Sequence, residues 1–60
     1  KAALEGYMSD LYAAWRRWED TRAEAVARNA PAAVQSALTT KTNGAWADYL
    51  TALNAWRLAV

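Results

Sequence analysis

The side chains that could support catalysis in this chain are few, and they lack the partners that catalysis needs. The sequence contains no His and no Cys, so Ser9 and Ser36 have no usual general base and the common transition-metal sites lose their main ligands. The acidic residues Glu19, Asp20 and Glu24 lie among arginines, a pattern typical of a solvated, charged helix face. We therefore expect no enzymatic activity, no cofactor and no metal.

The segment from Trp15 to Trp18 reads Trp-Arg-Arg-Trp and could contact nucleic acid or a membrane surface. Arg and Trp side chains stack on bases and lie at bilayer interfaces. However, Glu19 and Asp20 follow at once, where they would repel phosphates, and the net charge is only +1. Packing on one face of a helix is the favoured interpretation. There is no strong case for nucleic acid, interfacial membrane contact is a more distant alternative, and no apolar run is long enough to span a bilayer.

A helix must position these tryptophans, and the apolar residues around them predict its extent. Large apolar side chains recur at spacings of four and three residues, the pattern of a helix that buries one face. Alanine, which favours helix intrinsically, occupies much of the rest, and the predicted helix covers about residues 2–28. The residues expected to pack against another helix or a partner are Leu4, Met8, Leu11, Trp15 and Trp18.

Two polar residues occupy later positions of the same seam. Arg22 lies four residues after Trp18, and Asn29 lies seven residues after Arg22. Either the end of the helix leaves the core there, or these side chains set the register between helices, as single polar seam residues do in coiled coils. Arg22 and Asn29 are therefore candidates for setting the register.

The connection after this helix contains the strongest breaks in the sequence. Pro31 disfavours helical geometry at the preceding residue and suits the start of a new helix, so a short helix is predicted over residues 31–38. Residues 39–44, Thr-Thr-Lys-Thr-Asn-Gly, are the poorest helix formers of the chain. Thr-rich stretches and Asn-Gly pairs are typical of loops, and we predict a loop there. The sequence alone leaves open whether it breaks the helix.

A last helix is predicted from about residue 45 to residue 60. Its large side chains again alternate at spacings of three and four residues. This seam is out of phase with Val34 and Leu38, which favours a break between the two segments. The residues expected to pack against the first helix or a partner are Trp46, Tyr49, Leu53 and Trp56.

The fold expected for residues 1–60 is all-α: a helical hairpin or a short three-helix arrangement, completed by oligomerisation. A chain of 60 residues buries only about 60% of its unfolded surface, and such small domains usually need disulfides, a metal or association. Because the chain has no His and no Cys, association is the remaining means of stabilising it. The four Trp and three Tyr also supply more aromatic surface than two helices readily hide. The chain is one small helical domain or a fragment of a longer protein.

The last predicted helix carries a short pattern that resembles a known family. Residues 46–53, Trp-Ala-Asp-Tyr-Leu-Thr-Ala-Leu, are similar to the Trp-x-x-Tyr-x-x-Ala-Leu helix near the end of some phage tail-fibre assembly proteins. The likeness covers eight of sixty residues. The Arg that often follows the Tyr is Leu50 here, and the Pro-rich tail of that family is missing. The likeness implies a structural or assembly role in a phage virion as one candidate.

The expected function is that of a non-enzymatic structural or assembly protein, which packs through aromatic helix faces into a homo-oligomer or a larger particle. The alternative is a helical adaptor module that binds a different protein in a helix-in-groove mode. The expected partner is the chain itself or another helical protein. Trp, Tyr and Arg are enriched at binding hot spots, which suits both alternatives.

Overall fold

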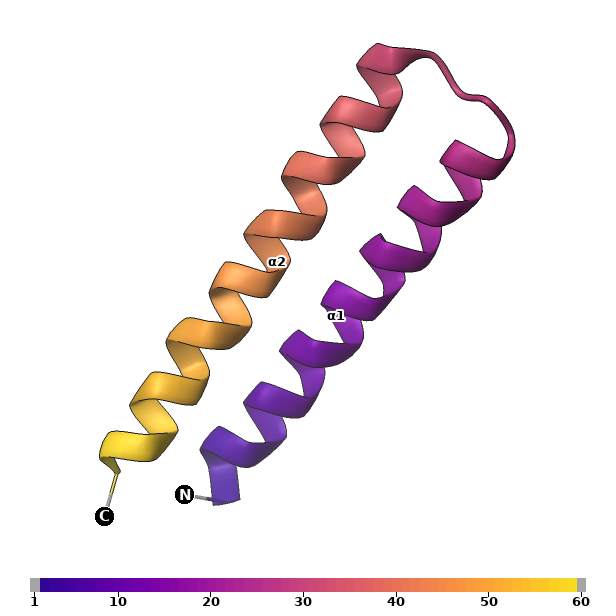
Figure 1. Cartoon of the computed structure of the whole chain (residues 1–60). Helices are drawn as coiled ribbons and strands as arrows, with labels where there is room; N and C mark the ends of the chain where they lie inside the picture. The colour runs from indigo at the N-terminus through magenta and orange to yellow at the C-terminus, as the bar shows by residue number, and fades with distance from the viewer. Residues whose placement is uncertain (1, 60) are drawn as a thin grey trace.

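The computed structural model describes residues 2–59 and consists of two antiparallel α-helices joined by a short turn (Figure 1). Helix α1 covers Ala2–Ala27, and helix α2 covers Ala32–Leu58. The predicted all-helical hairpin is confirmed, and the described residues form no third helix. The predicted extension of the last helix to residue 60 lies outside the described residues.

The turn that ends α1 is built around Asn29, whose φ of 56° lies in the left-handed region. The backbone N–H of Asn29 donates to the Val26 carbonyl at 3.1 Å. The N–H of Ala30 donates to the Ala25 carbonyl at 2.9 Å, and the two bonds together form a Schellman motif. Asn29 therefore lies beyond α1, and the residue predicted to continue the seam instead reverses the chain.

The start of α2 follows from the geometry of Pro31, which has φ −53° and ψ 148°. Its carbonyl accepts hydrogen bonds from the N–H groups of Val34 and Gln35 at 2.9 and 3.1 Å. The Gln35 side-chain amide reaches back to the Ala30 carbonyl at 2.8 Å. The bond from Val34 pairs one of the N–H groups that a helix start otherwise leaves to water, and the Gln35 side chain pairs a carbonyl of the turn.

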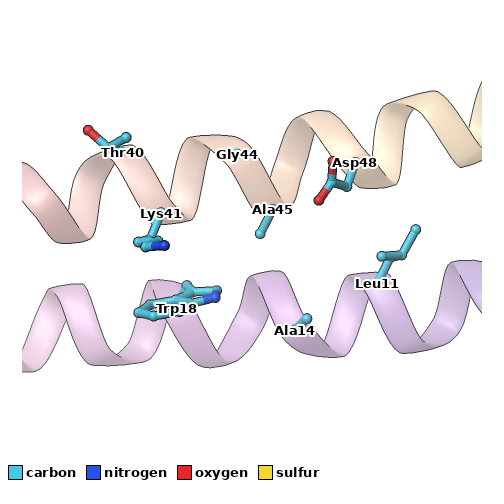
Figure 2. A pocket seen from close by; sticks show the side chains of 8 residues that line it. All are labelled: Leu11, Ala14, Trp18, Thr40, Lys41, Gly44, Ala45 and Asp48. Carbon is cyan, nitrogen blue, oxygen red and sulfur yellow. The ribbon is translucent and has the colours of Figure 1, made fainter.

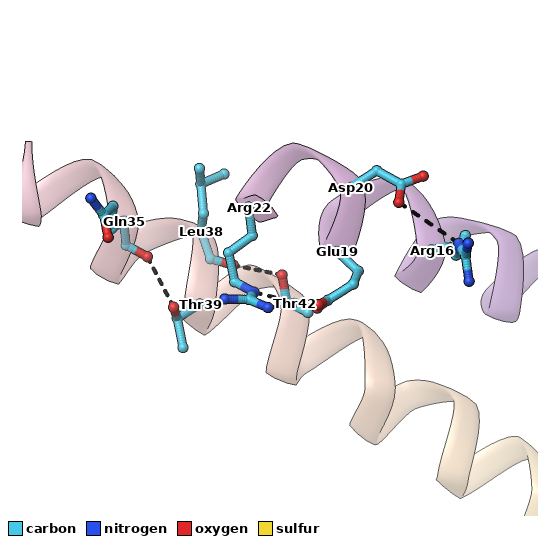
Figure 3. A network of polar contacts seen from close by, with 8 residues as sticks. All are labelled: Arg16, Glu19, Asp20, Arg22, Gln35, Leu38, Thr39 and Thr42. Carbon is cyan, nitrogen blue, oxygen red and sulfur yellow. Dashed lines mark hydrogen bonds and ion pairs between the residues drawn. The ribbon is translucent and has the colours of Figure 1, made fainter. Parts of the chain in front are cut away.

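The loop predicted for residues 39–44 is wrong, because α2 continues through this segment without a break. The hydroxyls of Thr39, Thr40 and Thr42 donate to the backbone carbonyls four residues earlier, at 3.0, 3.2 and 2.8 Å. Figure 3 shows the bonds of Thr39 and Thr42. Thr42 is also buried, with 5% of its surface exposed. The local preference against helix is below about 1 kcal/mol per residue, and packing against α1 outweighs it. The predicted separate helix over residues 31–38 is thus the first part of α2.

The seam of α2 that faces α1 also differs from the predicted one. Its less exposed positions alternate at spacings of three and four over the whole helix, so there is no change of phase. They are Gln35, Leu38, Thr42, Ala45, Tyr49, Ala52 and Trp56, with Leu53 beside Ala52, and the spacing continues to Ala59 just beyond the helix. Several of these residues are small or polar, which conceals the seam in the sequence. Trp46 and Leu53 each follow a seam position by one residue and flank it.

The hairpin is elongated, and its interior is thin. The Cα radius of gyration is 13.9 Å, whereas a compact domain of this length has about 10 Å. Ala52 and Thr42 are the residues classed as buried in residues 2–59, and no large side chain there is fully buried. The helices therefore cover one stripe of each other and leave the remaining apolar side chains partly exposed.

Candidate functional site

An aromatic cluster joins the two helices near the middle of the hairpin. Its members are Tyr12 and Trp15 of α1 and Trp46 and Tyr49 of α2. Between helices, the ring centroids of Trp15 and Trp46 lie 4.9 Å apart, and those of Tyr12 and Tyr49 lie 5.6 Å apart. Within helices, the Tyr12–Trp15 and Trp46–Tyr49 pairs lie 5.4 and 5.2 Å apart. All four distances are favourable for aromatic pairs. Each side chain of the cluster contacts two others, so the four contacts close into a cycle.

The aromatic cluster is only partly enclosed by the hairpin. Tyr12 and Trp46 keep 44% and 38% of their surfaces exposed, while Trp15 and Tyr49 are half-buried. Leu50, one turn after Trp46, is 41% exposed and extends the apolar surface along α2. The side of the hairpin that carries the cluster thus presents large apolar side chains to the surroundings.

A groove with a volume of about 500 Å³ lies between the helices (Figure 2). Three residues of α1 line it: Leu11, Ala14 and Trp18. Five residues of α2 complete it: Thr40, Lys41, Gly44, Ala45 and Asp48. Figure 2 shows Lys41 directed towards α1 on the side of Trp18, with Asp48 two turns further along α2. The groove therefore combines an indole wall, small residues and one charge of each sign.

The groove and the aromatic cluster lie on opposite sides of the hairpin. Tyr12 of the cluster and Ala14 of the groove are two residues apart on α1, which places them about 200° apart around the helix. The same separation holds on α2 between Trp46 of the cluster and Gly44 of the groove. The α1–α2 seam thus has an aromatic surface on one side and a grooved surface on the other.

The polar residue predicted to interrupt the seam of α1, Arg22, is half-buried and paired within its own helix. Its Nη2 atom lies 2.6 Å from Oε1 of Glu19, and its Nε donates to the other carboxylate oxygen at 3.3 Å. In Figure 3 the Arg22 side chain is directed towards the turn of α2 that carries Thr39 and Thr42. These hydrogen bonds lower the pKa of the Glu19 carboxyl and raise the pKa of Arg22. A register-setting role for Arg22 stays a prediction.

The open ends of the two helices are joined by a polar contact. The Trp56 indole Nε1 donates to Oε1 of Glu5 at 3.2 Å, which links the last turns of α2 to the first turns of α1. The bond lies at the end of the hairpin opposite the turn at Asn29 (Figure 1). It joins the helices at the end where no covalent connection does so.

The residues predicted to pack fall into two groups. Those half-buried in the hairpin are Leu4, Met8, Leu11, Trp15, Tyr49, Leu53 and Trp56. Trp18 and Trp46 are more exposed, at 36% and 38%, because Trp18 lines the groove and Trp46 flanks the seam. The set of predicted site residues omitted Tyr12, although its spacing of three residues from Trp15 suits a contact on a helix surface. It also omitted Lys41 and Asp48, which no apolar pattern could identify.

No group of three acidic side chains within residues 2–59 is placed to hold a metal ion. Over the same residues, neither helix contains an apolar stretch of the length required to cross a bilayer. No known protein family, curated protein or solved structure matches this chain. The candidate interaction sites are the aromatic cluster and the groove, which the geometry above describes.

Proposed function

We propose that this chain is a non-enzymatic structural or assembly protein, which packs through the aromatic faces of its helices into a homo-oligomer or a larger particle. The observation that carries the proposal is the incomplete interior of the hairpin. No large side chain among the described residues is fully buried, and Tyr12, Trp46 and Leu50 are each more than one-third exposed. Contiguous apolar surface of this kind marks interaction sites on small proteins.

The exposed area of the chain supports the same proposal. A compact monomer of this mass exposes about 3,900 Å², whereas the hairpin exposes 4380 Å². The difference arises because two helices side by side have no third layer to cover their flanks. A second hairpin laid on either side of the seam would supply that layer and form a helical bundle.

The polar residues support a role without catalysis. The chain has no His and no Cys, and Glu19 and Glu24 are engaged in ion pairs with Arg22 and Arg28 at 2.6 and 2.7 Å. Their contacts are those of helix-stabilising pairs three or four residues apart. The likeness of residues 46–53 to phage tail-fibre assembly proteins makes a phage particle one candidate for the larger assembly.

Sedimentation velocity over a concentration series tests self-association directly. We expect the mass of the wild-type protein to rise with concentration, and the accessibility of Trp to a neutral quencher to fall with it. Replacing Leu50 with Glu places a charge on the exposed aromatic side and should lower the mass of the assembly. Ala47→Glu introduces the same charge on the outer surface of α2 and serves as the control. A wild-type monomer at every concentration contradicts the proposal.

The groove favours a second candidate function, that of an adaptor whose groove receives a helix of a different protein. Its volume of about 500 Å³ and its small residues Ala14, Gly44 and Ala45 suit the close approach of another helix. This candidate requires a hairpin that stays monomeric on its own. The sedimentation series separates the two functions, because a wild-type chain that does not self-associate leaves only the adaptor.

A further inference from the structure

The groove has two charged residues of opposite sign, both on α2. Lys41 and Asp48 lie on α2 at the two ends of the α2 side of the groove, seven residues apart. This separation is about 10.5 Å along the helix axis. Neither side chain forms an ion pair with another residue of 2–59. The groove therefore carries one positive and one negative group with no opposite charge in contact.

The position midway between these charges is occupied by the smallest residues of the groove. Halfway between positions 41 and 48 lie Gly44 and Ala45. In a two-fold interface, residue i of one copy contacts residue j of the other, and j contacts i. A two-fold axis through Gly44–Ala45 with antiparallel α2 helices thus brings Lys41 of each copy to Asp48 of the other. Both charges gain an opposite partner at once.

The space at Gly44 admits this close approach. A Cβ atom built at Gly44 meets no other atom within 4 Å, so the packing of α1 against α2 does not require glycine there. Glycine inside a helix lowers helix stability relative to alanine. Because glycine has no side chain, it allows a second backbone to approach closely. Helices with small residues at the contact approach to about 8 Å.

The area of this side of the hairpin suits a dimer. A helix of the length of α2 is about 40 Å long and about 10 Å wide, so one side of two adjacent helices covers roughly 800 Å². Stable protein interfaces bury about 800 Å² per partner. Trp18, which is 36% exposed at the wall of the groove, would be covered in such a dimer.

We propose that two copies of this chain pack groove against groove, with antiparallel α2 helices crossing at Gly44–Ala45 and Lys41 of each copy paired with Asp48 of the other. This inference rests on the proposed self-association and names the groove side of the seam, which carries Trp18, as one of its contact surfaces. The aromatic cluster lies on the opposite side of the seam and stays available in this dimer for further assembly.

Charge reversal at the two positions tests the pairing. Lys41→Glu gives a groove with two acidic positions, and Asp48→Lys gives one with two basic positions. Each variant alone should dimerise at least about tenfold more weakly, because both ion pairs become repulsive contacts. A one-to-one mixture of the two variants should recover dimers near the wild-type Kd, since every acidic position then meets a basic one. Arg17→Glu and Asp10→Lys make the same changes of charge outside the groove and serve as matched controls.

A steric variant tests the crossing point independently of charge. Gly44→Leu should raise the dimer Kd at least about tenfold. Helix content by circular dichroism should stay the same or rise, because leucine favours helix over glycine and a Cβ atom at this position meets no other atom within 4 Å. Gly6→Leu is the control, since Gly6 also has open space around it but lies outside the groove. Unchanged dimerisation of Gly44→Leu contradicts the crossing at this residue.

The outcomes separate this inference from the proposed function. A wild-type protein that associates, with variants that associate equally well and a mixture that gains nothing, overturns the groove dimer and leaves self-association standing. A wild-type protein that stays monomeric overturns both. Recovery of the dimer only in the mixture of the two charge variants supports both.

Discussion

The indole rings of Trp15 on α1 and Trp46 on α2 have centroids 4.9 Å apart and planes inclined at 52°. This is the shortest of the four ring contacts in the aromatic cluster, and it joins residues from the two helices. The contact lies at the edge of the seam, where Trp46 keeps 38% of its surface exposed. It therefore contributes to the hairpin and also to the surface available to a partner.

Truncation of these rings should weaken the hairpin by an intermediate amount. Trp15→Ala should lower the free energy of unfolding by about 2–3 kcal/mol, less than the 3–5 kcal/mol typical of a fully buried Trp, because Trp15 is only half-buried. Urea unfolding at high protein concentration measures this change. In a double-mutant cycle with Trp46→Ala, we expect a coupling energy of about 0.5–1.5 kcal/mol. A cycle of Trp15→Ala with Leu58→Ala, whose side chain is 81% exposed, should show additive effects.

Proline substitution tests whether α2 is continuous through the Thr-rich segment. Thr40→Pro should lower the free energy of unfolding by about 3 kcal/mol and reduce helix content, because it removes a backbone donor inside the helix. Ala32→Pro is the matched control at the first residue of α2, where proline is tolerated and the preceding Pro31 already has ψ 148°. If circular dichroism and thermal melts are the same for both variants, the segment is not helical in solution.

The turn after α1 should respond to the conformational range of the residue at position 29. Asn29 has φ 56°, a region that costs most L-residues about 1–2 kcal/mol and β-branched residues at least as much. Asn29→Val should lower the midpoint of thermal unfolding, whereas Asn29→Gly should leave it unchanged or raise it. Equal midpoints for the two variants would show that the turn does not depend on this backbone geometry.

The Glu19–Arg22 pair should make stability depend on pH in the acidic range. The hydrogen bonds from Arg22 lower the pKa of Glu19 in the folded state from its ordinary value of 4.5, so the unfolded chain binds a proton more readily. The contribution is therefore fully present above pH 4.5 and is lost as the pH falls through the lowered folded-state pKa. Urea unfolding between neutral and acidic pH should show this loss, and Glu19→Gln or Arg22→Gln should each reduce it. A slope that both variants leave intact points to other groups.

Much of the fold could be predicted from local patterns. The alternating apolar residues from Leu4 to Trp18 indicate a helix with one buried face. The predicted range of about 2–28 agrees with α1, Ala2–Ala27, to within one residue. The break near Pro31 follows from the geometry that proline imposes on its neighbours. The absence of His and Cys leaves packing surfaces as the predicted means of stabilisation. These features depend on near neighbours in the chain, which a sequence displays directly.

The continuity and phase of α2 depended on tertiary structure. Thr42 and Ala52 are the buried positions of α2, yet neither is large or strongly apolar, so the sequence pattern gave them no weight. It placed Tyr49 and Trp56 on the seam, where they lie, but added Trp46 and Leu53, which flank it. The free energy gained by packing against α1 outweighs the low helix propensity of the Thr-rich segment. This gain arises only once the two helices meet. The groove has the same origin, because its two walls come from segments far apart in the chain. The spacing of residues along the chain determines which of them share a helix face. Packing between the helices decides which of those faces is covered.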